Sequence, residues 1–150
     1  MCTGNICRSP TAEGVARALA EKQGVGHLFT FDSAGTIGYH SGEPPDQRAI
    51  AAAARRGYNL TPLRARQVAE KDFFSFDHVL AMDRGHLKVL EKLCPPEQRP
   101  GLALFLEYAG KTPEDEVPDP YYGGPEGFDY VLSLVENAAE QLIRRLSMAV

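Results

Sequence analysis

Short apolar runs alternate with amphipathic stretches along this chain, and this alternation limits the possible folds more than any other feature. Runs of strand length lie at 28–31, 77–82 and 102–106. Segments typical of helices lie at 10–22, 49–56, 84–93 and from Phe128 to Leu146. Because parallel strands need long crossovers, the pattern predicts an α/β fold with three layers, helices covering both faces of a small parallel sheet.

The predicted helices have recognisable ends. Ser9, Asp46 and Asp83 are predicted N-caps, because each side-chain oxygen can accept a hydrogen bond from a free backbone N–H group. Gly24 and Gly57 follow two helical segments and predict their ends. In parallel sheets ligands bind beyond the carboxyl ends of the strands, so we expect the functional loops at that edge.

Composition limits the class of protein. The chain has 150 residues, so we expect one domain over 1–150, acting as a monomer. A net charge of −4 gives no long-range attraction to nucleic acid or to anionic membranes, and we expect neither as a partner. The three cysteines and the lack of a secretory apolar segment favour a reducing cytoplasm. No cluster has metal-ligand spacing, so no metal is expected.

The first nine residues after Met1, CTGNICRSP, combine a cysteine with an arginine six positions later. A cysteine pKa falls when backbone N–H groups, a cation and a helix N-terminus point at the thiol. Gly4 lets the backbone approach a ligand, and the Arg8 guanidinium matches two phosphate oxygens. The stretch therefore predicts an anion pocket with Cys2 as its nucleophile.

This nonapeptide resembles the active-site loop of the low-molecular-weight protein tyrosine phosphatases. Two later stretches, 32–36 (DSAGT) and 119–124 (DPYYGG), resemble the same family in the same order. The resemblance implies a four-stranded sheet and hydrolysis of phosphotyrosine through a phosphocysteine, with no cofactor. It also implies phosphotyrosine proteins as substrates, and a cognate tyrosine kinase as a partner. The residues implied in phosphate binding, besides Cys2 and Arg8, are Thr3, Gly4, Asn5, Ile6, Cys7 and Ser9.

The resemblance assigns Asp119 as the general acid and base. By itself, an Asp-Pro pair in a loop is ordinarily only a turn starter. Tyr39, Tyr121 and Tyr122 match the aromatic rim of the family's pocket, with core packing as the alternative. The tyrosine pair can be phosphorylated in the family, which makes Tyr121 and Tyr122 regulatory candidates. Because Cys2 must be a thiolate while Asp119 is protonated, we expect an acidic pH optimum for activity. We also expect chelators to leave the rate unchanged.

Two other residues of the loop, Ser9 and Cys7, each have two interpretations. Asn5 and Ser9 secure the loop and hydrogen-bond the thiolate in the family, but capping alone explains Ser9. Cys7 forms a protective, reversible disulfide with Cys2 or simply packs behind the loop. Ile6 favours phosphotyrosine over phosphoarginine, because the related arginine phosphatases carry Thr there. Cys94 is expected to be a small apolar residue at a helix end.

Some positions depart from the family or lie outside its motifs. Family members often carry a His near the position of Leu63 that supports the phosphate loop, so this support is in question. His40 and the basic string 64–67 are expected in solvated loops. The family also has an apolar strand before the nucleophile, between the strands matching 28–31 and 77–82, where this chain has only Met1. We therefore expect a longer natural product, or otherwise a poorly anchored Cys2 loop with weak activity.

Two other functions fit the same loop. A thioredoxin-coupled arsenate reductase shares the fold but relays a disulfide through two further cysteines downstream, and only Cys94 lies downstream here. A binding module for phosphotyrosine would keep the pocket without turnover. Hydrolysis of an aryl phosphate, and its loss in Cys2→Ser, separates an enzyme from such a module.

Overall fold

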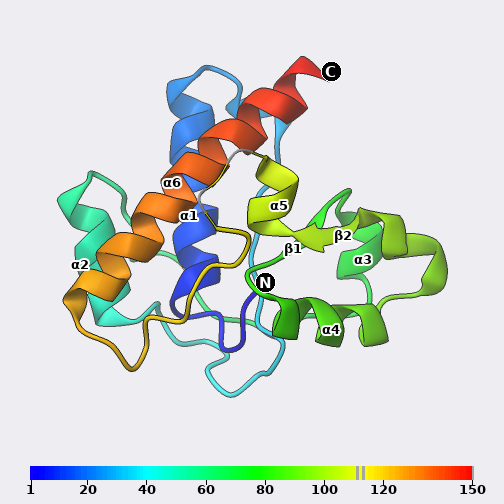
Figure 1. The fold of residues 1–150 in the computed structure, drawn as a ribbon, viewed down its shortest axis with the longest axis horizontal. Helices are drawn as coiled ribbons and strands as arrows, with labels where there is room; N and C mark the ends of the chain where they lie inside the picture. Colours follow the sequence, from blue (N-terminus) through cyan, green and yellow to red (C-terminus); the bar gives the residue numbers. More distant parts are fainter. Residues whose placement is uncertain (111, 113, 150) are drawn as a thin grey trace.

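Two helices packed against each other form the centre of the molecule (Figure 1). The computed structural model describes residues 1–110, 112 and 114–149. The central pair is α1 (Arg8–Lys22) and α6 (Pro125–Met148), with α2 (Gln47–Arg55) and α5 (Phe105–Ala109) also against α6. The remaining elements are η1 (Gly26–Leu28), α3 (Asp72–Ser75), β1 (Val79–Ala81), α4 (Arg84–Leu93), η2 (Pro96–Gly101) and β2 (Leu102–Leu104).

Strands β1 and β2 form a parallel sheet with apolar clusters on both faces. Val79 pairs with Leu102, and Ala81 pairs with Leu104. Side chains alternate along a strand, so Val79 and Ala81 pack with α3 and α4, whereas Leu80 packs against the cluster of α1 and α6. Helices therefore cover both faces, which confirms the α/β fold with a small parallel sheet.

The predicted helices are present, and two of the three predicted N-caps are confirmed. Asp46 accepts from the Arg48 N–H group, and Asp83 accepts from the His86 N–H group. The cap prediction for Ser9 was wrong. Helix α1 begins at Arg8 with Cys7 at its N-cap, because the Ser9 hydroxyl is engaged by the Cys2 sulfur and the Asn5 amide.

The predicted strand at 28–31 was also wrong. Leu28 ends η1, and 29–31 runs without a ladder partner among the described residues. A hollow of about 550 Å³ lies between this segment and β1, lined by apolar side chains that include Phe31, Leu80 and Phe105. Among the described residues the sheet has two strands, fewer than the four that the family pattern implies. The run at 102–106 is likewise divided, with β2 ending where α5 begins.

Candidate active site

The phosphate loop, Cys2–Ser9, is held between β1 and the segment that follows 29–31. Met1 contacts β1 on one side, its nitrogen donating to the Leu80 carbonyl at 2.6 Å. On the other side, the Thr36 N–H group donates to the Cys2 carbonyl at 2.8 Å. The loop then leads directly into α1 (Figure 1). The loop thus meets the 32–36 stretch, as expected, although the segment before this stretch is not a strand.

Asn5 organises the loop from within. Its φ of 59° is left-handed, which a non-glycine residue adopts only when its surroundings compensate. Its amide donates to the Ser9 hydroxyl at 2.8 Å and to the Ser33 hydroxyl at 2.9 Å. Its carbonyl accepts from the Arg66 N–H group at 3.0 Å. Three bonds from a side chain only 2% exposed fix the loop's curvature.

The direction of these bonds leaves one proton for the Cys2 sulfur. Cys2 Sγ lies 2.9 Å from Ser9 Oγ, and both residues are buried. The Asn5 amide nitrogen can only donate, so Ser9 Oγ accepts from it and its own proton is free to point at sulfur. A hydroxyl donor stabilises a thiolate more than a thiol. The geometry favours Cys2 as a nucleophile.

Arg8 is buried beneath the loop with its guanidinium fixed. One terminal nitrogen, Nη1, donates to Asp83 Oδ2 at 2.8 Å and to the Val117 carbonyl at 3.0 Å. Burial opposes ionisation of Asp83, but the His86 N–H group and Arg8 outweigh it and hold the Asp83 pKa below its usual range. Nη2 lies 3.8 Å from Asp119 Oδ2, so the predicted cation and the predicted acid converge.

Asp119 lies on a more open segment, the acid loop, Val117–Gly124. Its side chain is 51% exposed, and Oδ1 accepts from the Tyr121 N–H group at 3.0 Å. Arg48 steadies this loop, because it donates to the Tyr121 carbonyl at 2.9 Å and lies over the Tyr121 ring. Arg48 also pairs with Asp46, whose N–H group donates to the Ile6 carbonyl at 2.7 Å. This chain of contacts joins the acid loop to the phosphate loop.

The three predicted rim tyrosines lie outside the core. Tyr122 is 93% exposed and packs edge-on against Tyr121. Tyr39, 82% exposed, makes an edge contact with His40. His40 lies in a loop as expected but is less solvated than expected, because its side chain is 25% exposed and its ring lies over Gly4, where it leaves no room for a Cβ atom.

The expectation of a solvated loop at 64–67 holds for Arg64 and Gln67, which are exposed, but not for Ala65, which is buried. Arg66 is half-buried, pairs with Asp72 at 2.9 Å, and gives its N–H group to Asn5. Leu63, at the position where the family often has His, packs against the core instead.

The other two cysteines differ chemically from the predicted nucleophile. Burial, with the Asp46 carboxylate nearby, raises the pKa of Cys7 to about 12, so Cys7 is a protonated thiol at neutral pH. Cys94 ends α4 within the cluster of Leu90 and Leu104, as expected for a small apolar residue. Within the described ranges, no group of His, Cys, Asp and Glu could hold a metal ion.

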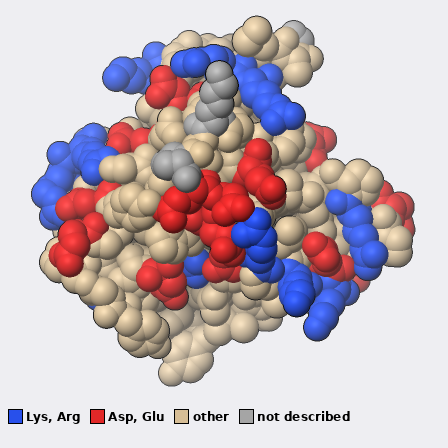
Figure 2. Space-filling view, viewed as in Figure 1, with Lys and Arg blue, Asp and Glu red and all other residues tan. Residues whose placement is uncertain are grey.

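Charge on the molecular surface is mixed. Figure 2 shows acidic and basic side chains interspersed over the face that Figure 1 presents, with acidic ones gathered near its centre. Around the start of α4, Arg84 pairs with Asp115 and Glu116. Among the described residues no helix is long and apolar enough to cross a membrane.

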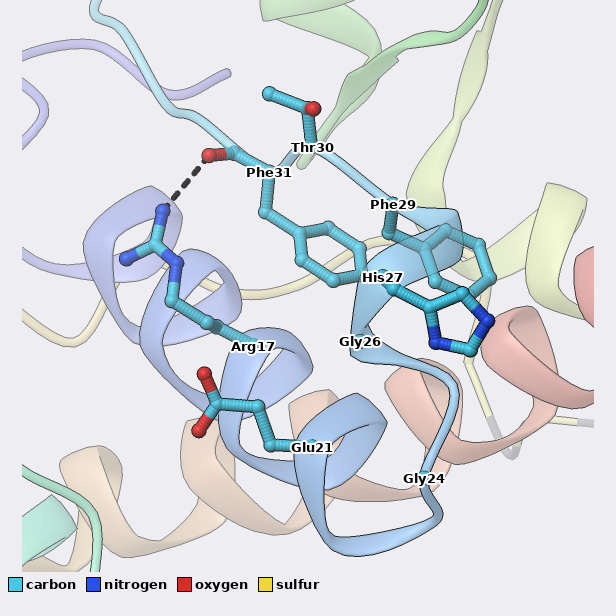
Figure 3. Close-up of a pocket in the computed structure, with 8 residues that line it drawn as sticks. All are labelled: Arg17, Glu21, Gly24, Gly26, His27, Phe29, Thr30 and Phe31. Atoms are coloured by element: carbon cyan, nitrogen blue, oxygen red, sulfur yellow. Dashed lines mark hydrogen bonds between the residues drawn. The ribbon is translucent and has the colours of Figure 1, made fainter.

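A separate pocket of about 560 Å³ lies at the opposite end of α1 (Figure 3). The rings of Phe29 and Phe31 stack there at 5.2 Å, and Arg17 donates to the Phe31 carbonyl. The lining contains none of the predicted site residues.

Comparison with known proteins gives the family of this chain. The family model described as low molecular weight phosphotyrosine protein phosphatase matches residues 1–150. The chain belongs to this family. The low molecular weight protein-tyrosine-phosphatase of Streptomyces coelicolor is 46% identical over 146 residues, covering 95% of this chain and 88% of that protein. As a member of this family, the protein is an enzyme of the protein-tyrosine-phosphatase type.

Solved structures of the family share the fold. A protein tyrosine phosphatase from Entamoeba histolytica aligns with a TM-score of 0.94 at 36% identity, covering 99% of this chain and 94% of that chain. YfkJ from Bacillus subtilis aligns with a TM-score of 0.90 at 36% identity, covering 99% and 92%. This agreement confirms a phosphatase fold for the chain.

Two site residues of this phosphatase escaped sequence reasoning. Asp83 was predicted only as a helix cap, and His86 was not singled out, yet both contact Arg8. The available signal was the spacing Asp-x-x-His directly after a buried strand. That spacing places both side chains on the first turn of α4, at the strand end where the phosphate loop lies.

Proposed function

We propose that this protein hydrolyses phosphotyrosine in proteins, with Cys2 as nucleophile, Arg8 as phosphate ligand and Asp119 as general acid and base. The observation that carries the proposal is the convergence of the three groups. The Ser9 hydroxyl faces the Cys2 sulfur, and Arg8 is fixed within 3.8 Å of Asp119. A loose phosphoryl transition state needs positioning and positive charge more than covalent chemistry, and a buried, oriented guanidinium supplies both.

The reaction divides into two displacements. In the first, the Cys2 thiolate forms a bond to phosphorus while the bond from phosphorus to the tyrosine oxygen breaks, and Asp119 gives its proton to that oxygen. In the second, the Asp119 carboxylate takes a proton from water as the water oxygen attacks phosphorus. The S–P bond then breaks, which returns the thiolate and releases inorganic phosphate. Arg8 neutralises the phosphoryl oxygens in both steps.

The surroundings of the site favour a flat substrate carried on a protein. Tyr39, Tyr121 and Tyr122 are exposed beside the loops, where they can pack on an aryl ring. We infer phosphotyrosine proteins as substrates, a cognate tyrosine kinase as their source, and a monomer acting in the cytoplasm. The Cys2 to Cys7 bridge and phosphorylation at the tyrosine pair stay predictions.

Turnover of p-nitrophenyl phosphate, with and without EDTA, tests the proposal. We expect a metal-independent rate that Cys2→Ser abolishes and that Cys94→Ser, the matched control outside the site, retains. Peptides with phosphotyrosine should be cleaved and those with phosphoserine should not. Phosphate binding without turnover would indicate a binding module, and reduction of arsenate with thioredoxin would indicate the reductase.

A further inference from the structure

His86 lies on the first turn of α4 and is only 5% exposed, with its ring against the phosphate loop. Nε2 lies 2.7 Å from the Thr3 hydroxyl oxygen and 3.4 Å from Arg8 Nη2. Nδ1 lies 3.0 Å from Asp83 Oδ1 but makes no hydrogen bond. The ring thus stands between the loop and the carboxylate that holds Arg8.

The protonation state of the ring follows from its neighbours. A guanidinium has only donors, so the nitrogen facing Arg8 must be an acceptor. A bare Nε2 also allows the Thr3 hydroxyl to donate to it. The proton of the neutral ring is then on Nδ1, beside the negative charge of Asp83. This tautomer satisfies both neighbours of Nε2, and it places the Nδ1 proton, which makes no hydrogen bond, near the Asp83 carboxylate.

We propose that His86 is a positioning residue: a neutral imidazole, protonated on Nδ1, whose Nε2 holds both Arg8 and Thr3 in place for the substrate phosphate. The proposal rests on the phosphatase function proposed above and adds a residue that acts through Arg8. Packing alone is a weaker explanation, since an apolar side chain would fill the space without leaving a buried nitrogen that lacks a hydrogen bond.

The charged surroundings keep this imidazole neutral. Burial, and then the Arg8 guanidinium, lower the pKa of His86 to about 4, although Asp83 and the more distant Asp119 act in the opposite direction. The ring is therefore an acceptor throughout the range in which the enzyme would be assayed.

The first experiment observes the ring directly. Long-range proton–nitrogen NMR spectra of the wild-type protein with labelled histidine distinguish the Nδ1–H tautomer, the Nε2–H tautomer and the imidazolium. We expect the Nδ1–H pattern at pH 6 for His86, assigned by its loss in His86→Gln. An Nε2–H pattern or an imidazolium would overturn the proposal, whatever the activity.

The second experiment measures phosphate affinity without turnover, through protection of Cys2 from iodoacetamide by inorganic phosphate. In His86→Leu the dissociation constant should rise about 10- to 100-fold, the loss expected for a hydrogen bond to a charged group. In His86→Gln an amide oxygen can occupy the position of Nε2, and the constant should return to within about 3-fold of wild type. His27→Leu, at the far end of α1, is the control and should match wild type.

The outcomes separate the two proposals. If the wild type binds phosphate but does not hydrolyse aryl phosphates, the proposed function fails and the role of His86 is still decided by affinity. If turnover is present but His86→Leu binds phosphate as the wild type does, the role of His86 fails. Should His86→Leu not fold, the tautomer of the wild-type ring and the phosphate affinity of His86→Gln decide. A phosphate dissociation constant about 10-fold above wild type in His86→Gln would overturn the proposal.

Discussion

The phosphate loop and the acid loop meet at Arg8, but they are built in opposite ways. In the phosphate loop, Asn5 is 2% exposed and Arg8 is 4% exposed. Asn5 alone makes one hydrogen bond within the loop, to Ser9, and two to distant parts of the chain, at Ser33 and Arg66. In the acid loop, the Asp119 side chain is 51% exposed and Tyr122 is 93% exposed. The phosphate loop is fixed by buried contacts. The acid loop is buried at Val117, where it begins, and is mostly exposed farther along.

The difference follows from what each loop has to do. A site that stabilises charge works best when its dipoles are oriented before the reaction, so the anion cradle is buried and rigid. The groups that meet a leaving group and a peptide must stay accessible. We therefore expect changes in the phosphate loop to affect every substrate and also stability, and changes in the acid loop to affect only selected substrates.

Arg8→Lys should have the largest effect. An ammonium group cannot reproduce the planar fork that contacts Asp83 and the Val117 carbonyl while facing phosphate. We expect kcat/KM to fall about 10³-fold for aryl phosphates of any leaving group. Arg17→Lys, on the same helix but at the pocket of Figure 3, is the control and should retain the wild-type rate. A loss below about 10-fold would show that Arg8 is not the phosphate ligand.

Asp119→Asn tests the acid loop with the same assay. Only poor leaving groups need the proton, so kcat should fall about 10²-fold for phosphotyrosine and much less for p-nitrophenyl phosphate. Stability should change little, because the side chain is half exposed and its Oδ1 bond to the Tyr121 N–H group can be kept by an amide oxygen. An equal loss for both substrates would assign Asp119 to loop structure.

The contrast between the loops also explains what the sequence could predict. Motif residues such as Cys2, Arg8 and Asp119 stand in recognisable strings, and the structure brings them together. The Asp-x-x-His spacing marks Asp83 and His86 as candidates, but their contacts with Arg8 depend on tertiary packing and are visible only in the structure. The strand at 28–31 was misjudged for a similar reason, since a strand depends on a neighbour and not on its own apolar residues. Ser9 was assigned to a cap because its partners, Cys2 and Asn5, are visible only in three dimensions.

Asn5→Ala and Asn5→Gly, compared by urea unfolding, measure the rigidity of the phosphate loop. Both variants lose the three side-chain bonds, and we expect each to lose about 2 to 4 kcal/mol of unfolding free energy. Alanine should be worse than glycine by about 1 kcal/mol, because it must also keep the left-handed conformation at φ 59°. Equal stabilities would mean that the loop relaxes its backbone once the side chain is gone.

The titration of His86 should also make the protein less stable at mildly acidic pH. Its folded pKa is lowered to about 4 from the usual 6.5, so the unfolded chain binds a proton in this window that the folded chain does not. The contribution of the neutral His86 to the unfolding free energy is complete above pH 6.5 and is lost as the pH drops toward 4. The unfolding free energy then falls by at most about 1.4 kcal/mol per pH unit. His86→Gln cannot titrate, and its unfolding free energy should vary less between pH 7 and pH 4. Parallel curves for the two proteins would contradict the lowered pKa.

The smallest effect is expected where the two loops are joined. Arg48 donates to the Tyr121 carbonyl and pairs with Asp46, which in turn donates its N–H group to the phosphate loop at Ile6. Arg48→Met keeps an unbranched side chain near the Phe128 ring but removes the bond to the acid loop, so Asp119 is placed less accurately. We expect kcat to fall about 5-fold for phosphotyrosine, with little change for p-nitrophenyl phosphate and none in phosphate affinity. Arg55→Met, which removes an exposed ion pair from the same helix, is the matched control. A loss of phosphate affinity in Arg48→Met alone would show that this link also shapes the phosphate loop, and that the two loops are less independent than their burial suggests.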